Sequence, residues 1–122
     1  MEIKTRNNGD CTVLDLSGKL VLGPETMKLR NTVREAAEKN PRKIVLNLRK
    51  ITYVDSCGLG ELVSRYAHVR SQGGDLVLLD PPDRIMSLLI LSKLESVFEI
   101  FKDEPSAVAD SKQNQTLRQM TG

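Results

Sequence analysis

Short apolar runs alternate with longer amphipathic stretches along the chain, which is typical of strands alternating with helices. Asn8-Gly9 lies between two runs of alternating apolar and polar residues and favours a tight hairpin turn. The segments predicted to form strands are residues 2–6, 12–16, 43–48, 75–79 and 97–101.

Amphipathic helices are predicted between the later strands. The first begins at Gly23-Pro24-Glu25, because proline suits the first helical position and glutamate favours the positive end of the helix dipole. Asp103-Glu104-Pro105 predicts one more short helix. The residues expected to face inward are Leu29, Val33 and Ala36 in the first helix, Leu59, Leu62, Val63 and Tyr66 in the second, and Ile85, Leu88 and Leu89 in the third.

This order predicts an α/β fold with a mixed, mostly parallel sheet, an N-terminal antiparallel hairpin and about four helices. Right-handed crossovers place the loops that lead from strand to helix along one edge of the sheet. Those loops are predicted at residues 18–23, 55–58 and 80–83. In open α/β sheets this edge is where function usually resides.

The 122 residues suggest one domain, predicted to span residues 1–112. Residues 113–122 have few apolar side chains and no periodicity, so a disordered tail is expected there. No apolar run approaches the length of a membrane span, and the N-terminus lacks the apolar core of a signal peptide. The two cysteines lack framework spacing, so reduced thiols in a cytoplasmic protein are expected.

Composition argues against several classes of function. The net charge is only +2, the basic residues are interspersed with acidic ones, and there are four aromatic residues, so nucleic acid is not an expected partner. The single histidine, His68, lies off the apolar stripe and about three helical turns from Cys57. An enzyme, a metal site and a bound cofactor are therefore not predicted.

The segment from Asp55 to Gly58 combines small polar residues with the start of the second helix. Ser56 or Asp55 can cap the free N–H groups of the first turn, and Gly58 permits close backbone approach. The junction is then either a well-capped strand-to-helix connection or a place where an anion, such as a phosphate carried by a hydroxyl, is stabilised by the helix end.

The segment Asp55-Ser-Cys-Gly-Leu-Gly60 resembles the signature of the STAS domain of bacterial anti-sigma factor antagonists, which typically reads Asp-Ser-Ser-Gly-Leu-Gly. The likeness covers residues 3–109. It includes Leu16-Ser-Gly-Lys-Leu20, Ile44-Val-Leu-Asn-Leu48, Gly73-Gly-Asp-Leu-Val77 and Val97-Phe-Glu-Ile-Phe101. The resemblance implies a STAS fold and capture of a partner-switching anti-sigma factor, an ATP-dependent serine kinase whose phosphorylation of the antagonist abolishes capture.

Two positions depart from the family pattern. The resemblance puts the phosphorylated hydroxyl directly before the first glycine, where this chain has Cys57, so only the adjacent Ser56 could accept a phosphate. We expect Ser56 to be the helix cap, with its oxygen turned inward. Typical antagonists also carry an acidic residue in the loop that here reads Val21-Leu22-Gly23-Pro24. Leu22 and Val21 either form part of a contact surface or pack against the core.

The predicted partner-binding surface combines this loop with the exposed face of the second helix, where Glu61 and Ser64 are expected to be solvent-facing. Its members are Val21, Leu22, Pro24, Asp55, Ser56, Cys57, Gly58, Gly60, Glu61 and Ser64. The protein is expected to be a monomer or a weak homodimer. Alternatives are a STAS subunit of a lipid transporter, a signalling scaffold, or a redox sensor that uses Cys57, since a thiol at a helix N-terminus tends to be reactive.

Overall fold

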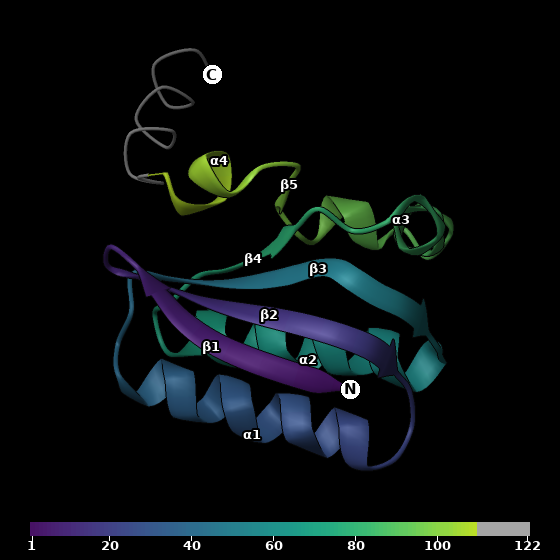
Figure 1. Cartoon of the computed structure of the whole chain (residues 1–122), viewed down its shortest axis with the longest axis horizontal. Helices are drawn as coiled ribbons and strands as arrows, with labels where there is room; N and C mark the ends of the chain where they lie inside the picture. Colours follow the sequence, from purple (N-terminus) through teal and green to yellow (C-terminus); the bar gives the residue numbers. More distant parts are fainter. Residues whose placement is uncertain (110–122) are drawn as a thin grey trace.

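The computed structural model describes residues 1–109, in which helices cover both faces of a five-stranded sheet (Figure 1). The predicted domain boundary at residue 112 and the predicted disordered tail at 113–122 lie outside the described residues. The elements are β1 (Glu2–Asn8), β2 (Cys11–Leu20), α1 (Pro24–Glu38), β3 (Lys43–Val54), α2 (Ser56–Ser71), β4 (Leu76–Leu79), α3 (Asp83–Leu91), the 3-10 helix η1 (Leu94–Ser96), β5 (Ile100–Phe101) and α4 (Glu104–Val108).

The sheet has the spatial order β1-β2-β3-β4-β5. Strand β1 pairs with β2 in the antiparallel sense, and all later pairs are parallel. This confirms the predicted mixed sheet with an N-terminal hairpin. Each parallel connection contains a helix, so the loops that enter α1, α2 and α3 all lie at the carboxyl-terminal edge of the parallel strands.

Alternating residues of the strands fill two hydrophobic layers. One row in register across β2, β3 and β4 is Leu14, Leu46 and Leu78, and the other is Val13, Val45 and Val77. The leucine row packs with α1, α2 and α3, whereas the valine row packs with α4 on the opposite face. Because both faces are covered here, the strands read as continuous apolar runs in the sequence.

The predicted inward faces of the helices are largely confirmed. Helix α1 buries all three residues expected of it, and α3 buries Ile85 and Leu89. In α2, Leu62 is fully buried, whereas Leu59 is partly buried and packs against the main core. Leu88 in α3 is half-buried.

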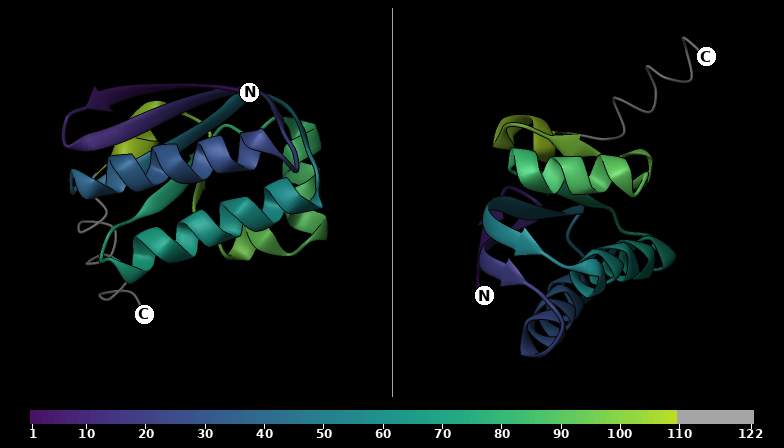
Figure 2. Two further views of the ribbon diagram at one scale, coloured as in Figure 1. Left: turned by 90° about the horizontal axis from the view of Figure 1, so that it is seen from below. Right: turned by 90° about the vertical axis from the view of Figure 1, so that its right-hand side faces the viewer.

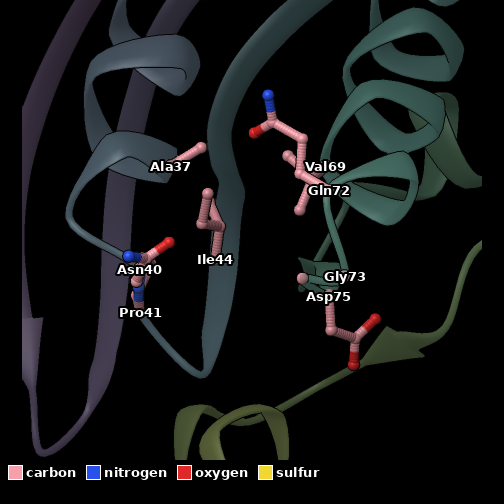
Figure 3. Close-up of a pocket in the computed structure, with 9 residues that line it drawn as sticks. Ala37, Asn40, Pro41, Ile44, Val69, Gln72, Gly73 and Asp75 are labelled. Carbon is pink, nitrogen blue, oxygen red and sulfur yellow. The ribbon is translucent and has the colours of Figure 1, made fainter.

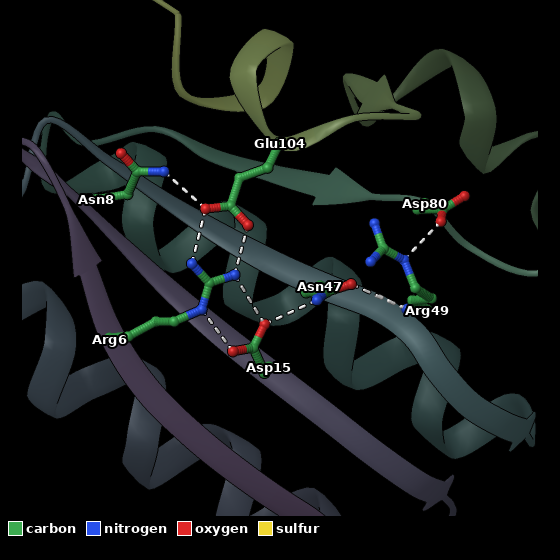
Figure 4. Close-up of polar contacts among 7 residues, drawn as sticks. All are labelled: Arg6, Asn8, Asp15, Asn47, Arg49, Asp80 and Glu104. Atoms are coloured by element: carbon green, nitrogen blue, oxygen red, sulfur yellow. Dashed lines mark hydrogen bonds and ion pairs between the residues drawn. The ribbon is translucent and has the colours of Figure 1, made fainter.

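Helix α4 is held on the sheet by polar contacts of two cations in addition to its apolar packing. Lys43 is only 2% exposed, and its Nζ donates to the backbone oxygens of Ala107 at 3.0 Å and Ala109 at 3.2 Å. Arg6 pairs with Glu104 at the other end of α4 and with Asp15 on β2 (Figure 4). A helix of five residues is too short to be stable by itself, so these contacts fix it.

Three strand predictions need correction. The strand predicted at residues 43–48 is β3, which continues to Val54. Gly18 does not lie in a loop: β2 continues to Leu20, with irregular register on either side of Gly18, which has a φ of 103°. The predicted strand 97–101 is reduced to Ile100–Phe101, which pair with Leu78 and Leu79 of β4, and the 3-10 helix η1 ends at Ser96 just before the predicted start. Phe98 instead packs edge-on against Tyr66, with ring centroids 5.3 Å apart.

Candidate functional site: the first turn of α2

Helix α2 begins directly after β3, and Asp55 is the residue between them. Asp55 is the N-cap: its backbone is extended, with φ of −92° and ψ of −178°, and its Oδ1 accepts a hydrogen bond from the N–H of Gly58 at 2.7 Å. One of the free N–H groups at the helix start is thereby satisfied. The expectation that Ser56 provides the cap is wrong, since Ser56 is the first helical residue and is exposed.

The second carboxylate oxygen of Asp55 holds the loop between β2 and α1. Oδ2 accepts from the backbone N–H of Leu22 at 3.0 Å, and the N–H of Asp55 in turn donates to the carbonyl oxygen of Leu20 at 3.3 Å. Figure 2 shows the loop that precedes α1 and the start of α2 at the same end of the molecule. A single side chain therefore joins two of the three loops predicted to share this edge.

Gly58 lies where α2 approaches the end of β2 most closely. A Cβ added at this position would lie 2.2 Å from the carbonyl oxygen of Leu20 and 2.9 Å from Cγ1 of Val54. Both contacts are far inside van der Waals distance, so the backbone of α2 could not stay in place with any side chain here. Gly60, by contrast, is exposed, and a Cβ there would meet nothing within 4 Å.

The electrostatics of the site are set by the chain's own carboxylate. Hydrogen bonds from the backbone N–H groups of Leu22 and Gly58 hold the pKa of Asp55 below its ordinary value, so Asp55 is charged. A negative charge at the amino end of a helix also interacts favourably with the helix dipole. Asp55 thus places a negative charge of the chain itself at this helix end.

The structure brings most of the predicted partner-binding residues to one surface around this turn. Leu22 is 71% exposed, so the loop does not simply pack its side chains into the core, although Val21 is half-buried. Asp55 is half-buried and Gly58 is buried. The members that are exposed are Leu22, Pro24, Ser56, Cys57, Gly60 and Ser64.

Glu61 does not belong to the exposed face, which corrects the sequence-based expectation. Its side chain is 5% exposed and lies between α1 and α2. Its two oxygens accept from Nε and a terminal nitrogen of Arg30, at 2.9 and 3.2 Å, and Nε of Arg65 approaches at 3.4 Å. A buried carboxylate needs such partners, and Glu61 consequently connects the two helices near the candidate site.

Sequence reasoning did not assign Tyr53, although it lies at the same edge. Tyr53 is paired in register with Lys19 on β2 and is 47% exposed, two residues before Asp55. The alternation of side-chain directions at the end of β3 could have indicated it, because Val54 points inward and the adjacent Tyr53 must then point outward. An exposed aromatic residue beside a candidate contact surface is typical of interfaces.

Two hollows lie away from this turn. One of about 180 Å³ is lined by the last residues of α1 and α2 together with Ile44 at the start of β3. Figure 3 shows the amide groups of Asn40 and Gln72 on either side of Ile44, with the carboxylate of Asp75 pointing away. The other, of about 350 Å³, lies between the β1–β2 hairpin and α1. Neither contains a residue of the predicted contact surface.

Within residues 1–109, no three His, Cys, Asp or Glu side chains are grouped as ligands for a metal ion. No described helix is both long and apolar enough to cross a bilayer. Both cysteines are free thiols, Cys11 buried and Cys57 exposed.

Residues 2–107 match the model of the STAS domain family, and the chain belongs to that family. An anti-sigma F factor antagonist of Paenibacillus polymyxa is 27% identical over 111 residues, which cover 90% of this chain and 94% of that protein. A Thermotoga maritima protein assigned to the anti-sigma factor antagonists has a TM-score of 0.78 at 23% identity, covering 86% of this chain and 90% of that one. The Bacillus cell fate determinant SpoIIAA in its phosphorylated form has a TM-score of 0.67 at 19% identity, covering 88% and 96%.

Proposed function

We propose that this chain is an anti-sigma factor antagonist that acts by binding an anti-sigma factor and not by catalysing a reaction. The sequence likeness to the Paenibacillus polymyxa antagonist extends over nearly the whole of both proteins, which supports this class of function. The proposal retains the cytoplasmic location expected from the sequence, where transcription is regulated.

The observation that carries the proposal is the connection made by Asp55. It keeps the exposed Leu22 beside the first turn of α2, so that an apolar side chain, the exposed Gly60 and small exposed residues lie close together. An exposed leucine held in place by a hydrogen-bonded loop costs little entropy on binding, which favours protein recognition. The two hollows described above are lined by other residues, which favours a partner protein over a small ligand at this surface.

The partner is proposed to be an anti-sigma factor of the serine kinase type, with an altered phosphorylation switch. Cys57 stands where the family motif has a hydroxyl, and its side chain is exposed at the first turn. A thiol does not accept a phosphate from such a kinase. The chain therefore binds its partner without release by phosphorylation at this position.

Titration calorimetry tests the proposal with purified anti-sigma factors encoded in the same genome. One of them should bind the chain with a dissociation constant of about 1 μM or tighter. Leu22→Asp should weaken that binding at least tenfold, because it places a charge in the apolar part of the surface. Leu91→Asp, on α3, is the matched control, since Leu91 is 80% exposed and lies outside the proposed surface. The absence of binding to every anti-sigma factor would contradict the proposal.

A further inference from the structure

Glu61, between the neighbouring helices α1 and α2 (Figure 2), is a single carboxylate shared by two guanidinium groups. Arg30 of α1 takes both of its oxygens, through Nε at 2.9 Å and Nη2 at 3.2 Å. Arg65, one turn after Glu61 on α2, approaches Oε1 only to 3.4 Å. Within residues 1–109 neither guanidinium contacts another carboxylate. The cluster therefore carries one positive charge in excess.

The more deeply buried of the two guanidinium groups is the one without a hydrogen bond. The Arg65 side chain is 13% exposed, and among the described residues its Nε is buried and has no hydrogen-bond partner. The Arg30 side chain is 44% exposed and can be hydrated. A donor without a partner destabilises a protein more when it is buried than when water reaches it. The observed pairing thus leaves unsatisfied an N–H group that another pairing would satisfy.

The alternative pairing joins Glu61 to Arg65. A glutamate four residues before an arginine on a helix is the favourable orientation for such a pair. The separation of 3.4 Å exceeds an ordinary N–H···O bond of about 2.9 Å by an amount that a small rotation of the carboxylate closes. This rotation weakens the bonds to Arg30, which then needs another acceptor. A carboxylate from outside the chain is the acceptor that fits the fork of an arginine best.

Arg30 lies next to the proposed contact surface. Glu61 directly follows the exposed Gly60 on α2, so the cluster begins where that surface ends. On α1, Met27 is 48% exposed and precedes Arg30 by three residues, on the same side of the helix. Arginine and methionine are both enriched in protein interfaces. A partner that covers the start of α1 and the first turns of α2 therefore comes within reach of Arg30.

We propose that Arg30 is a docking residue for a carboxylate group of the partner protein, and that its engagement lets Glu61 close its bond to Arg65. The inference rests on the proposed function for the identity of this partner, an anti-sigma factor. It extends the contact surface from α2 onto α1. Arg65 does not touch the partner: it contributes because binding satisfies its buried Nε, which is unsatisfied in the free chain.

The rearrangement can be tested without any partner, because ¹H–¹⁵N spectra resolve arginine Nε–H groups and report their exchange with water. In Arg30→Ala, Glu61 is free to turn to Arg65. The Nε–H of Arg65 should then exchange about tenfold more slowly than in the parent chain, and the melting temperature should not fall. An unchanged exchange rate, or a lower melting temperature, would show that Arg30 is a structural tie and would overturn the rearrangement.

Calorimetry with the anti-sigma factor tests the docking role. Arg30→Ala should weaken binding about tenfold and make the dissociation constant less sensitive to salt, because a charge pair across the interface is lost. Arg30→Lys keeps the charge without the fork and should lie between the two. The matched control is Arg49→Ala, because the Arg49 side chain is 56% exposed and also pairs with a carboxylate, that of Asp80 at 2.8 Å, but outside the proposed surface.

The outcomes separate this inference from the proposed function. If the parent chain binds an anti-sigma factor and Arg30→Ala binds it as tightly, or with the same salt dependence, the docking role of Arg30 is wrong while the proposed function stands. If the parent chain binds no anti-sigma factor, the proposed function is wrong and the docking role fails with it. In the complex of the parent chain, the Nε–H of Arg65 should show the same slow exchange as in free Arg30→Ala, and faster exchange would contradict the coupling.

Discussion

The carboxylate of Asp55 accepts a hydrogen bond from the backbone N–H of Leu22, 33 positions earlier in the chain, at 3.0 Å. The same carboxylate caps α2 through Gly58. One side chain thus orders a helix start and an exposed loop together, and the two halves of the proposed contact surface depend on each other.

Asp55→Ala should therefore impair binding more than an ordinary cap substitution does. It removes the acceptor for Gly58 and releases the loop at Leu22, so we expect a melting temperature lower by several degrees and weaker capture of the anti-sigma factor. Asp55→Asn keeps one carbonyl oxygen as an acceptor and should recover part of both properties. Thermal melts and calorimetry on the three proteins measure this, and a loss of stability without any loss of affinity would contradict the coupling.

Gly60→Ala should separate stability from binding. Because nothing lies within 4 Å of a Cβ at this exposed helical position, alanine should stabilise the fold by roughly 0.5–1 kcal/mol through its helix propensity. The added methyl group should weaken partner binding if the partner contacts the backbone here. Urea unfolding and calorimetry provide the two readouts.

Gly58→Ala is the counterpart of that variant. Its Cβ would collide with the carbonyl oxygen of Leu20, so the domain should be strongly destabilised. For the earlier Gly60→Ala variant, a gain in stability with the same affinity for the partner as the parent chain would place Gly60 outside the interface.

Glu61→Gln should destabilise the protein by about 1–3 kcal/mol, measured by urea unfolding. The glutamine cannot satisfy two guanidinium groups, and Arg65, whose side chain is only 13% exposed, would be left without a counter-charge. Arg30 is exposed enough to be hydrated instead. Ser64→Ala, on the exposed face one turn later, is the control and should leave stability unchanged. If Glu61→Gln leaves the free energy of unfolding unchanged, the cluster is hydrated and does not link the two helices.

Short apolar runs separated by turn residues and amphipathic stretches were sufficient to predict the sheet, because its central strands bury residues on both faces. Val13 and Leu14 exemplify this: they face opposite layers, and both layers are closed by helices. The length of β5 could not be predicted in the same way, because a strand is defined by its pairing, and only Ile100 and Phe101 pair with β4. Pairing partners are a property of the assembled sheet and not of the local sequence.

The site was predicted less completely than the fold, for two physical reasons. Asp55 and Ser56 are both good helix caps, and only the backbone geometry decides that the cap is Asp55 and that the helix starts one residue earlier than expected. Glu61 was placed at the surface because charged residues are rarely buried. Its burial depends on Arg30, 31 positions earlier, which approaches only when α1 packs beside α2.

Acid should loosen α4 through Arg6. Hydrogen bonds from Arg6 hold the pKa values of Glu104 and Asp15 below their ordinary values of 4.5 and 3.8. A carboxylate with a lowered pKa in the folded state stabilises the fold above its ordinary pKa. That contribution is lost as the pH falls below it, because the unfolded chain takes up protons first.

The melting temperature should consequently fall between about pH 5 and pH 3, and Arg6→Gln should flatten this dependence. Arg34→Gln is the control, because the only hydrogen bond from the Arg34 side chain within residues 1–109 goes to Asn31. An unchanged pH profile in the Arg6 variant would show that other carboxylates dominate acid unfolding.

Restoring a hydroxyl at position 57 should restore a phosphorylation switch. Wild-type protein incubated with the proposed anti-sigma factor kinase and ATP should stay unmodified, because Cys57 is no acceptor. Ser56 is exposed but lies one residue earlier on the helix, where the side-chain direction differs by about 100°. Cys57→Ser should gain one phosphoryl group and then lose its partner, since a phosphate adds nearly two negative charges next to Asp55 and the apolar Leu22. Intact mass and calorimetry before and after incubation give both results, and the double variant Ser56→Ala, Cys57→Ser locates the phosphate.

Stoichiometric phosphorylation of the wild-type chain at Ser56 would show that the switch has moved by one residue and is not lost. A Cys57→Ser protein that binds the kinase yet remains unmodified would show that position 57 is not presented to the kinase as an acceptor.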